Sequence, residues 1–326
     1  MKFSVLGGGR WGTALSLHLG RLGHDVLVFE RNEGVVELLN KGLHPYIEGI
    51  TLKRVRASQD LKEVLSFSAY VIIALPVQAI DKVLREEDIS GKVFISASKG
   101  LEVSTNRRVS QIIRDINPDA KVFCLSGPSF AAEVSKGLPT ALVLAGNDLE
   151  EMERIRVAIS SETFRVYLSQ DLVGVELGGA LKNVIAIACG ISDGLGFGEN
   201  ARASLITRGL AEMVRIGVAL GAKRETFYGL SGVGDLFLTA SSSQSRNRSF
   251  GYMLGQGLSV EEALKALNQT VEGIHTVRAV YELSRKNNLH APISLAVYRA
   301  VVEKVDPRQV ALDLLRRPPQ NPFESV

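Results

Sequence analysis

A glycine-rich turn close to the N-terminus constrains the fold of this chain more than any other segment. The apolar run Phe3–Leu6 leads directly into Gly7, Gly9 and Gly12, which have the spacing G-x-G-x-x-G, and a helical pattern follows at once. After a strand, the first glycine permits a tight turn, the second lets a pyrophosphate approach the backbone, and the third allows close packing between helix and strand. A glycine-rich turn without a ligand is the alternative. The strand–turn–helix context favours a dinucleotide-binding unit.

Short apolar runs alternate with helical patterns through the first half of the chain. Apolar residues at helical spacing in Trp11–Leu22 and Val77–Arg85 separate runs that are apolar on both faces, as a sheet covered by helices requires. The strand-like runs are Phe3–Leu6, Val26–Phe29, Ala69–Leu75, Val93–Ala97, Val122–Ser126 and Ala141–Ala145. Such strand–helix–strand units with right-handed crossovers predict an α/β fold with a doubly wound, Rossmann-type sheet.

The pattern changes near residue 170, because strand signals stop after Asp171 and helical patterns take over. The predicted helices are Leu172–Ser192, Ala201–Leu220, Val260–Leu267, Val277–Lys286 and Ile293–Val302, and only the proline-rich segment 318–322 is expected to be unstructured. A chain of 326 residues also exceeds what one hydrophobic core usually holds. We therefore predict a dinucleotide-binding domain over residues 1–170 and an all-helical substrate and catalytic domain over residues 171–326.

The composition excludes several classes of protein. Lys and Arg number 38 against 35 Asp and Glu, and this scattered balance of +3 gives a weak bias toward anionic small molecules and no nucleic-acid footprint. Cys124 and Cys189 lie in apolar segments without the spacing of a metal or redox pair, so we expect both to be buried and reduced. Neither a secretory signal nor a run of about 18 apolar residues is visible. We expect a cytoplasmic protein without membrane insertion and without a metal site.

The end of the second predicted strand bears on the choice of cofactor. Glu30, Arg31 and Asn32 follow Phe29, about 20 residues beyond the glycine motif. An acidic residue at this place accepts hydrogen bonds from the adenosine ribose of NAD, whereas an arginine meets the 2′-phosphate of NADP. Both could instead be solvated charges at a strand end. The residues therefore leave NAD and NADP open.

Two further loops follow predicted strands. Ser98-Lys99-Gly100 comes after Val93–Ala97, and residues 126–131 come after the strand that starts at Val122. Ligands of an open sheet gather outside the carboxyl ends of its strands. Lys99 is therefore a candidate cation for a substrate or cofactor phosphate, although a solvated loop lysine is the alternative.

Lys182 is the only charged residue between Leu177 and Ser192. Burying an ammonium there without a partner would cost several kcal/mol or lower its pKa, so such a lysine can exchange a proton near neutral pH. Gly178 and Gly179 precede it, and each costs roughly 1 kcal/mol relative to alanine inside a helix, which indicates close approach of another backbone or a ligand. A lysine that reaches solvent along an apolar helix is the alternative.

Polar residues farther along the chain could supply the partners of this lysine. Asp235 and Thr239 are four residues apart, so on a helix they share one face. A carboxylate on that face could orient a lysine and change its proton affinity. The alternative is that Asp235 caps a helix. Ser245 has the character of an N-cap, with Arg246 and Asn247 in the first turn. A helix start with a hydroxyl, a guanidinium and an amide is a strong phosphate receptor, and a capped surface helix is the alternative.

A dinucleotide site, a proton-exchanging lysine and a phosphate receptor together predict hydride transfer to the carbonyl of a small phosphorylated substrate, with Lys182 supplying the proton. Two alternatives remain. A hydroxyacid or ketopantoate reductase would have no need for the receptor at residues 245–247. A non-enzymatic dinucleotide sensor would have no use for Lys182 together with Asp235 and Asn183.

Over essentially its whole length, the chain resembles the NAD(P)-dependent glycerol-3-phosphate dehydrogenases. The resemblance rests on colinear segments at residues 7–14, 98–100, 126–131, 176–183, 200–213 and 229–247. It implies reversible, NAD(P)H-dependent reduction of dihydroxyacetone phosphate to sn-glycerol 3-phosphate, which feeds glycerophospholipid biosynthesis. It also implies a homodimer.

The resemblance implies roles for single residues as well. Lys182 is similar to the general acid/base of the family, with Asp235, Asn183 and Thr239 beside it. The positions that match substrate contacts are Lys99, Gly127, Ser129, Lys182, Asp235, Ser245, Arg246 and Asn247. Those that match the cofactor lining are Arg10, Trp11, Arg31, Asn32, Lys99, Ala131, Arg246, Val271 and Glu272, beside Gly7, Gly9, Gly12 and Glu30 from the motif itself. Arg10 and Glu30 depart from many relatives, which bears on NADP preference and not on the reaction.

Overall fold

The computed structural model describes residues 1–268 and 270–317, which group into two compact units. The first contains Met1–Ser98 and Val109–Leu172, and the second contains Lys99–Arg108 and the chain from Val173 onward. Lys99–Arg108 was expected in the first domain, but its contacts place it in the second unit. The division at residue 170 into two domains otherwise stays a prediction, and the proline-rich segment 318–322 lies outside the described residues.

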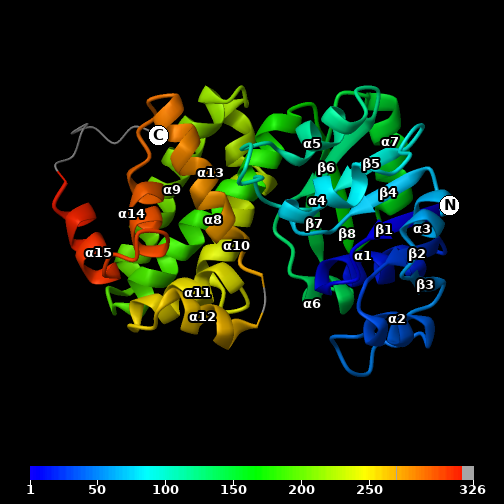
Figure 1. Cartoon of the computed structure of the whole chain (residues 1–326), viewed down its shortest axis with the longest axis horizontal. Helices are drawn as coiled ribbons and strands as arrows, with labels where there is room; N and C mark the ends of the chain where they lie inside the picture. The colour runs from blue at the N-terminus through cyan, green and yellow to red at the C-terminus, as the bar shows by residue number, and fades with distance from the viewer. Residues whose placement is uncertain (269, 318–326) are drawn as a thin grey trace. The chain divides into compact units, whose positions relative to one another are not determined.

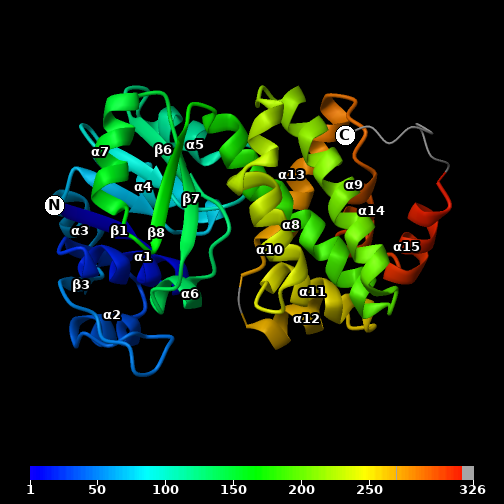
Figure 2. The same ribbon diagram turned by 180° about the vertical axis from the view of Figure 1, so that it is seen from behind.

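The first unit contains one eight-stranded sheet in the order β3-β2-β1-β4-β5-β6-β7-β8. The strands are β1 (Lys2–Leu6), β2 (Asp25–Phe29), β3 (Val55–Ser58), β4 (Tyr70–Ile73), β5 (Val93–Ser96), β6 (Lys121–Ser126), β7 (Thr140–Ala145) and β8 (Phe164–Ser169). The doubly wound sheet is confirmed, with two strands more than the sequence predicted, β3 and β8. β7 runs antiparallel to β6 and parallel to β8, which lies beside it in Figure 2.

Helices cover both faces of this sheet. Alternate residues of each strand point to opposite faces, so the apolar side chains on both faces need a covering layer. Val26 and Val28 belong to one hydrophobic cluster with α1, whereas Leu27 and Phe29 belong to another with α3, α4 and α5. The helices of the unit are α1 (Arg10–Arg21), α2 (Glu33–Asn40), α3 (Leu61–Phe67), α4 (Val77–Leu84), α5 (Val109–Ile116), α6 (Ala131–Ser135) and α7 (Leu149–Ile159). The apolar central strands are therefore buried on both sides, as the sequence predicted.

The second unit is helical, and its longest helix, α8 (Leu172–Gly194), runs through the middle of it (Figures 1 and 2). The other α-helices are α9 (Gly198–Ala219), α10 (Asp235–Ser241), α11 (Arg246–Gly255), α12 (Val260–Leu267), α13 (Glu272–Lys286), α14 (Pro292–Val301) and α15 (Pro307–Leu315). A 3-10 helix, η1 (Arg224–Tyr228), and a π-helical turn, η2 (Leu230–Gly234), lead into α10. All five helices predicted with bounds are present; the structure gives the extent of α11, of which only the start was predicted, and adds α10 and α15.

α8 is long and apolar enough by composition to cross a bilayer, but 94% of its most apolar 18-residue window is buried inside the structure. It is therefore the core helix of its unit. Lys182 and Asn183 lie near its middle, which fixes the position of both side chains.

Candidate active site

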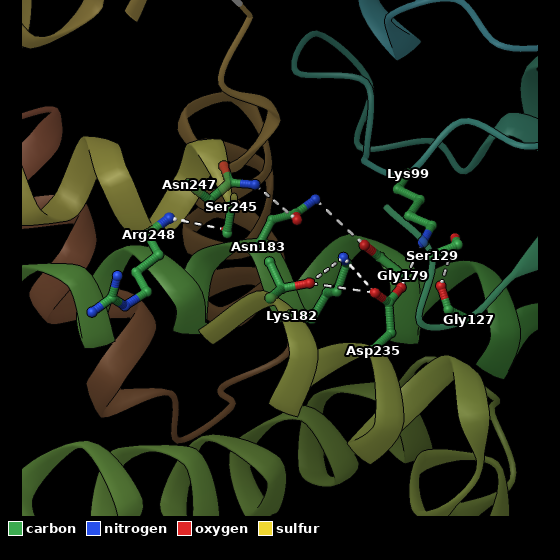
Figure 3. Close-up of polar contacts among 11 residues, drawn as sticks. Lys99, Gly127, Ser129, Gly179, Lys182, Asn183, Asp235, Ser245, Asn247 and Arg248 are labelled. Carbon is green, nitrogen blue, oxygen red and sulfur yellow. Dashed lines mark hydrogen bonds and ion pairs between the residues drawn. The ribbon is translucent and has the colours of Figure 1, made fainter. Parts of the chain in front are cut away.

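Lys182 forms a buried ion pair with Asp235. Its Nζ donates to Asp235 Oδ1 at 2.7 Å and to Thr239 Oγ1 at 2.6 Å, and the lysine side chain is 8% exposed (Figure 3). Thr239 Oγ1 also donates to Asp235 Oδ1, at 3.3 Å. An ammonium has three protons to donate, so these two contacts leave the third for a ligand. Lys182 thus does not reach solvent.

The close approach predicted at the helical glycines explains how Asp235 reaches this lysine. A Cβ at Gly178, one turn before Lys182, would lie 2.5 Å from the carbonyl oxygen of Ser231 in η2. α8 therefore packs directly against the π-helical turn that leads into α10. Asp235 is the first residue of α10, whose N-cap is Gly234, and its carboxylate accepts from the lysine.

A second lysine shares the same carboxylate. Lys99 Nζ donates to Asp235 Oδ2 at 2.6 Å, and the Asp235 side chain is only 2% exposed. The pKa of Lys182 is lowered to about 8, mainly by burial; Asp235 opposes this decrease, and the positive charges of Lys99 and Arg246 contribute to it. Near neutral pH Lys182 is therefore mostly ammonium with a minor fraction of amine, so both forms needed for proton transfer in the two directions are present.

Asn183 contacts Asn247 rather than Lys182. Asn247 Nδ2 donates to Asn183 Oδ1 at 2.9 Å, while Asn247 Oδ1 accepts from the Gly273 amide at 3.0 Å (Figure 3). Asn183 Nδ2 in turn donates to the Gly179 carbonyl at 3.4 Å. This chain of amides joins α8, α11 and α13, so the two asparagines fix these helices beside the lysine.

The predicted N-cap at Ser245 is confirmed. Its Oγ accepts from the Arg248 amide at 3.2 Å, and α11 begins at Arg246. Ser245 is buried, whereas the Arg246 side chain is exposed, and its positive charge reaches both Lys182 and Glu272. The start of α11 therefore brings cationic and hydrogen-bonding groups near the lysine, as an anion site requires.

Glu272 opens α13 directly after its buried N-cap residue, Val271. Within the described part of the chain, Glu272 Oε2 is buried without a hydrogen-bond partner. Burial raises the pKa of Glu272 to about 7, and Arg246 opposes this increase. A buried carboxyl oxygen without a partner fits a residue that hydrogen-bonds a ligand.

The glycine motif has the geometry that a dinucleotide requires. Gly7 has φ +109°, and a Cβ at Gly12 would lie 1.9 Å from the Gly7 carbonyl oxygen, so neither position accepts a side chain without rearrangement. By contrast, a Cβ at Gly9, the N-cap of α1, would have no atom within 4 Å. The space at Gly9 lets a pyrophosphate approach the start of α1, so the residues fit the cofactor.

The residues around this loop tie it to the end of β2. Glu30 accepts from the Gly8 amide at 3.0 Å and from the Asn32 amide at 2.9 Å, and Asn32 caps α2. Arg31 is exposed. Trp11 Nε1 is buried without a partner in the described residues, which again leaves a donor available for a ligand.

Tyr46 was not among the site residues predicted from the sequence. Its hydroxyl donates to the Gly8 carbonyl at 2.9 Å, and the Arg10 guanidinium lies 5.3 Å from the centre of its ring. A single tyrosine in the long loop after α2 carries no sequence signal, because only the fold brings that loop to the glycine turn.

The third predicted loop of the first unit follows β6. Gly127 has φ +138°, a conformation that favours glycine, and its carbonyl accepts from Ser129 Oγ at 3.1 Å. Ala131 begins the short helix α6. These three residues therefore lie at the carboxyl end of a strand, as the sequence predicted.

The chain matches known proteins along nearly its whole length. Residues 2–152 match the sequence model of the NAD-dependent glycerol-3-phosphate dehydrogenase N-terminus, and residues 171–312 match that of the C-terminus. A glycerol-3-phosphate dehydrogenase [NAD(P)+] of Thermoanaerobacter sp. (strain X514) is 42% identical over all of both chains. One from Halothermothrix orenii is 43% identical over all of this chain and 97% of its own length.

Solved structures give the same likeness. The crystal structure of glycerol-3-phosphate dehydrogenase from Coxiella burnetii has a TM-score of 0.93 at 37% identity, over 97% of this chain and 99% of that one. A D-mandelate dehydrogenase structure matches with a TM-score of 0.65 at 14% identity, which shows a shared fold alone.

Proposed function

This chain belongs to the NAD-dependent glycerol-3-phosphate dehydrogenase family, and we propose that Lys182 is the acid–base group of its reaction. The enzyme reduces dihydroxyacetone phosphate reversibly to sn-glycerol 3-phosphate with NADH or NADPH, a step that supplies glycerophospholipid biosynthesis. The observation that carries the role of Lys182 is its buried position between Asp235 and Thr239, with a pKa lowered to about 8.

The residues that hold the cofactor follow from the geometry of the glycine turn. We assign the pyrophosphate to the start of α1, where Gly9 leaves open space and Gly7 and Gly12 keep the turn compact. Trp11 and Glu272 each have a buried polar atom that a bound cofactor could satisfy. When bound, the nicotinamide group supplies the hydride for C2 of the substrate.

The substrate phosphate is assigned to the start of α11. Ser245, Arg246 and Asn247 place a hydroxyl, a guanidinium and an amide there, next to the free backbone N–H groups of the first turn. Lys99, Gly127 and Ser129 are proposed as further substrate contacts. A hydroxyacid reductase or a non-catalytic sensor would have no use for this phosphate receptor.

Lys182 then completes the reaction with one proton. As ammonium it donates its third N–H to the oxygen that develops negative charge at C2, and it returns to the amine after the transfer. In the oxidative direction the amine removes the hydroxyl proton of sn-glycerol 3-phosphate. Asp235 and Thr239 hold Nζ in place, and Lys99 keeps the proton affinity of Lys182 low enough for both directions.

Substitution of the lysine tests this assignment. Lys182→Met should lower kcat by about 10²–10⁴-fold, the usual contribution of a general acid–base group, because the variant has no ammonium at this position to donate the proton. The dissociation constant for NADH should change little. Lys265→Met, at an exposed position of α12, is the matched control and should keep full activity. Wild-type turnover in Lys182→Met would refute the role.

We further propose that the chain works in the cytoplasm as a homodimer, as the family resemblance implies. Sedimentation equilibrium would then give twice the 35.3 kDa of one chain. A single species at the monomer mass under assay conditions would rule the dimer out.

A further inference from the structure

The helical unit contains a cavity of about 760 Å³ that the reaction does not use. α8, α9, α14 and α15 form its walls, with Ile191, Leu205, Val297, Val310 and Leu314 among the lining side chains. None of the residues assigned to substrate or cofactor lines it. Its volume lies in the range of small-molecule sites, roughly 300–1,000 Å³. The cavity is therefore large enough for a small molecule, and its apolar walls favour a hydrocarbon group.

One part of the lining is strongly positive. Arg208 and Arg215 of α9 line the cavity together with His290 and Arg317. Arg215 Nε donates to the His290 carbonyl at 3.1 Å, and Arg317 Nη2 lies 3.4 Å from His290 Nε2. All three arginines lie close enough to His290 to lower its pKa together with burial. The four side chains thus form one cluster, which we call the arginine cluster.

No acidic side chain among residues 1–268 and 270–317 forms an ion pair with these arginines. Burial raises the pKa of Glu212, and Arg215 opposes this increase only as the last of several contributions, because the Glu212 carboxylate is held at the start of α14. There it accepts from the amides of Ile293 and Ser294, both at 2.8 Å, and from the Ser294 hydroxyl at 2.6 Å. The positive charge of the arginine cluster is therefore available to an anion.

We propose that this cavity binds a medium-chain fatty acid, with the hydrocarbon chain along the apolar walls and the carboxylate at the arginine cluster. The free energy of binding becomes more favourable in proportion to the apolar area that the hydrocarbon chain and the walls remove from water. A guanidinium pairs with a carboxylate through two parallel hydrogen bonds. A sugar phosphate or a nucleotide fits poorly, because its hydroxyl groups would lie against Leu205, Val297 and Val310 without partners.

Binding of dodecanoate to the full-length protein, measured by titration calorimetry below the micelle concentration, tests the proposal. One saturable site per chain is expected. Octanoate should bind roughly a hundredfold more weakly, because it lacks four methylene groups that the walls would bury. Dodecanol should bind about tenfold or more weakly than dodecanoate, because it lacks the charge.

Three variants connect the binding to the cavity. Ala296→Trp fills it from α14 and should weaken dodecanoate by at least about tenfold, with Ala311→Trp as the replacement where the first variant does not fold. Arg208→Gln combined with Arg215→Gln should remove most of the preference for dodecanoate over dodecanol, because only Arg317 then remains as an arginine of the cluster. Arg308→Gln on α15, outside the cavity, is the control and should change nothing. Turnover of dihydroxyacetone phosphate should stay at the wild-type value in all of them.

Three results would overturn the proposal. The first is the absence of saturable dodecanoate binding to the wild type. The second is an affinity that Ala296→Trp and the double arginine variant leave unchanged, which would mean nonspecific adsorption. The third is conversion of a dimer into a monomer by Ala296→Trp, observed by sedimentation, since a second copy of the chain would then cover the cavity.

Discussion

The glycine turn and the lysine site are built in opposite ways. At the turn, backbone atoms do the work, and Gly9 leaves open space within 4 Å of the position that a side chain would take. At the lysine site, side chains surround the Asp235 carboxylate. Lys99 Nζ lies 2.6 Å from its Oδ2, and Lys182 Nζ lies 2.7 Å from its Oδ1. The glycine turn thus offers backbone atoms to a ligand, whereas the lysine site has the side chains that our proposal needs for proton transfer.

The difference also decides what each region tolerates. A change at the turn acts through available space, whereas a change at the lysine site acts through charge. Variants that separate space from charge therefore test the comparison.

The largest expected effect comes from a change at Asp235. Asp235→Asn removes the charge that holds Lys182 and Lys99 together, so Lys182 should have a lower pKa and carry less ammonium at pH 7.5. We expect kcat for reduction of dihydroxyacetone phosphate to fall by about 10²-fold. Asp119→Asn, at an exposed position of the first unit, should leave it unchanged. Equal rates for both variants would show that the carboxylate has no part in the proton transfer.

The two glycines of the turn should respond differently to the same added methyl group. Gly12→Ala places a Cβ 1.9 Å from the Gly7 carbonyl oxygen, so urea unfolding should show a loss of about 1–3 kcal/mol. Gly9→Ala meets no atom and keeps an ordinary φ of −66°, so it should preserve stability and weaken NADH binding instead. If both variants lose stability equally, the open space at Gly9 does not exist in solution.

The smallest effect is expected at the end of β2. Glu30→Gln removes a negative charge that the Gly8 and Asn32 amides hold in place, so a 2′-phosphate should meet less repulsion. The ratio of kcat/KM for NADPH to that for NADH should rise by about tenfold, and Glu33→Gln in the first turn of α2 is the matched control. A fall in this ratio would place the adenosine ribose elsewhere.

The same contrast explains what the sequence could predict. The turn at residues 7–12 is a local motif, and the strands beside it are continuous apolar runs, so the Rossmann-type sheet follows from them. β3 and β8 were missed because each alternates buried with exposed residues, such as Arg56 in β3 and Arg165 in β8, and so lacks the continuous apolar run by which the other strands were predicted. β7 is an apolar run like the other predicted strands, so only the fold determines that it runs antiparallel to β6.

The sequence was enough to predict which residues form the lysine site, but not which of them contact one another. The isolated charge of Lys182 and the i, i+4 pair of Asp235 and Thr239 are visible in the sequence, whereas the second lysine on the same carboxylate is not. Lys99 reaches Asp235 because residues 99–108 leave the sheet and pack with the helical unit. Contacts between residues more than a hundred positions apart have no local signature.

The pH dependence of the chemical step tests the central claim most directly. Single-turnover rates isolate proton and hydride transfer from product release. With Lys182 at a pKa of about 8, the rate of reduction should fall as pH rises through 8, because the ammonium is lost, and the rate of oxidation should rise over the same range. Lys99→Met should move both midpoints upward, since the positive charge of Lys99 lowers the Lys182 pKa. Rates that stay constant between pH 7 and 9 in both directions would contradict the account.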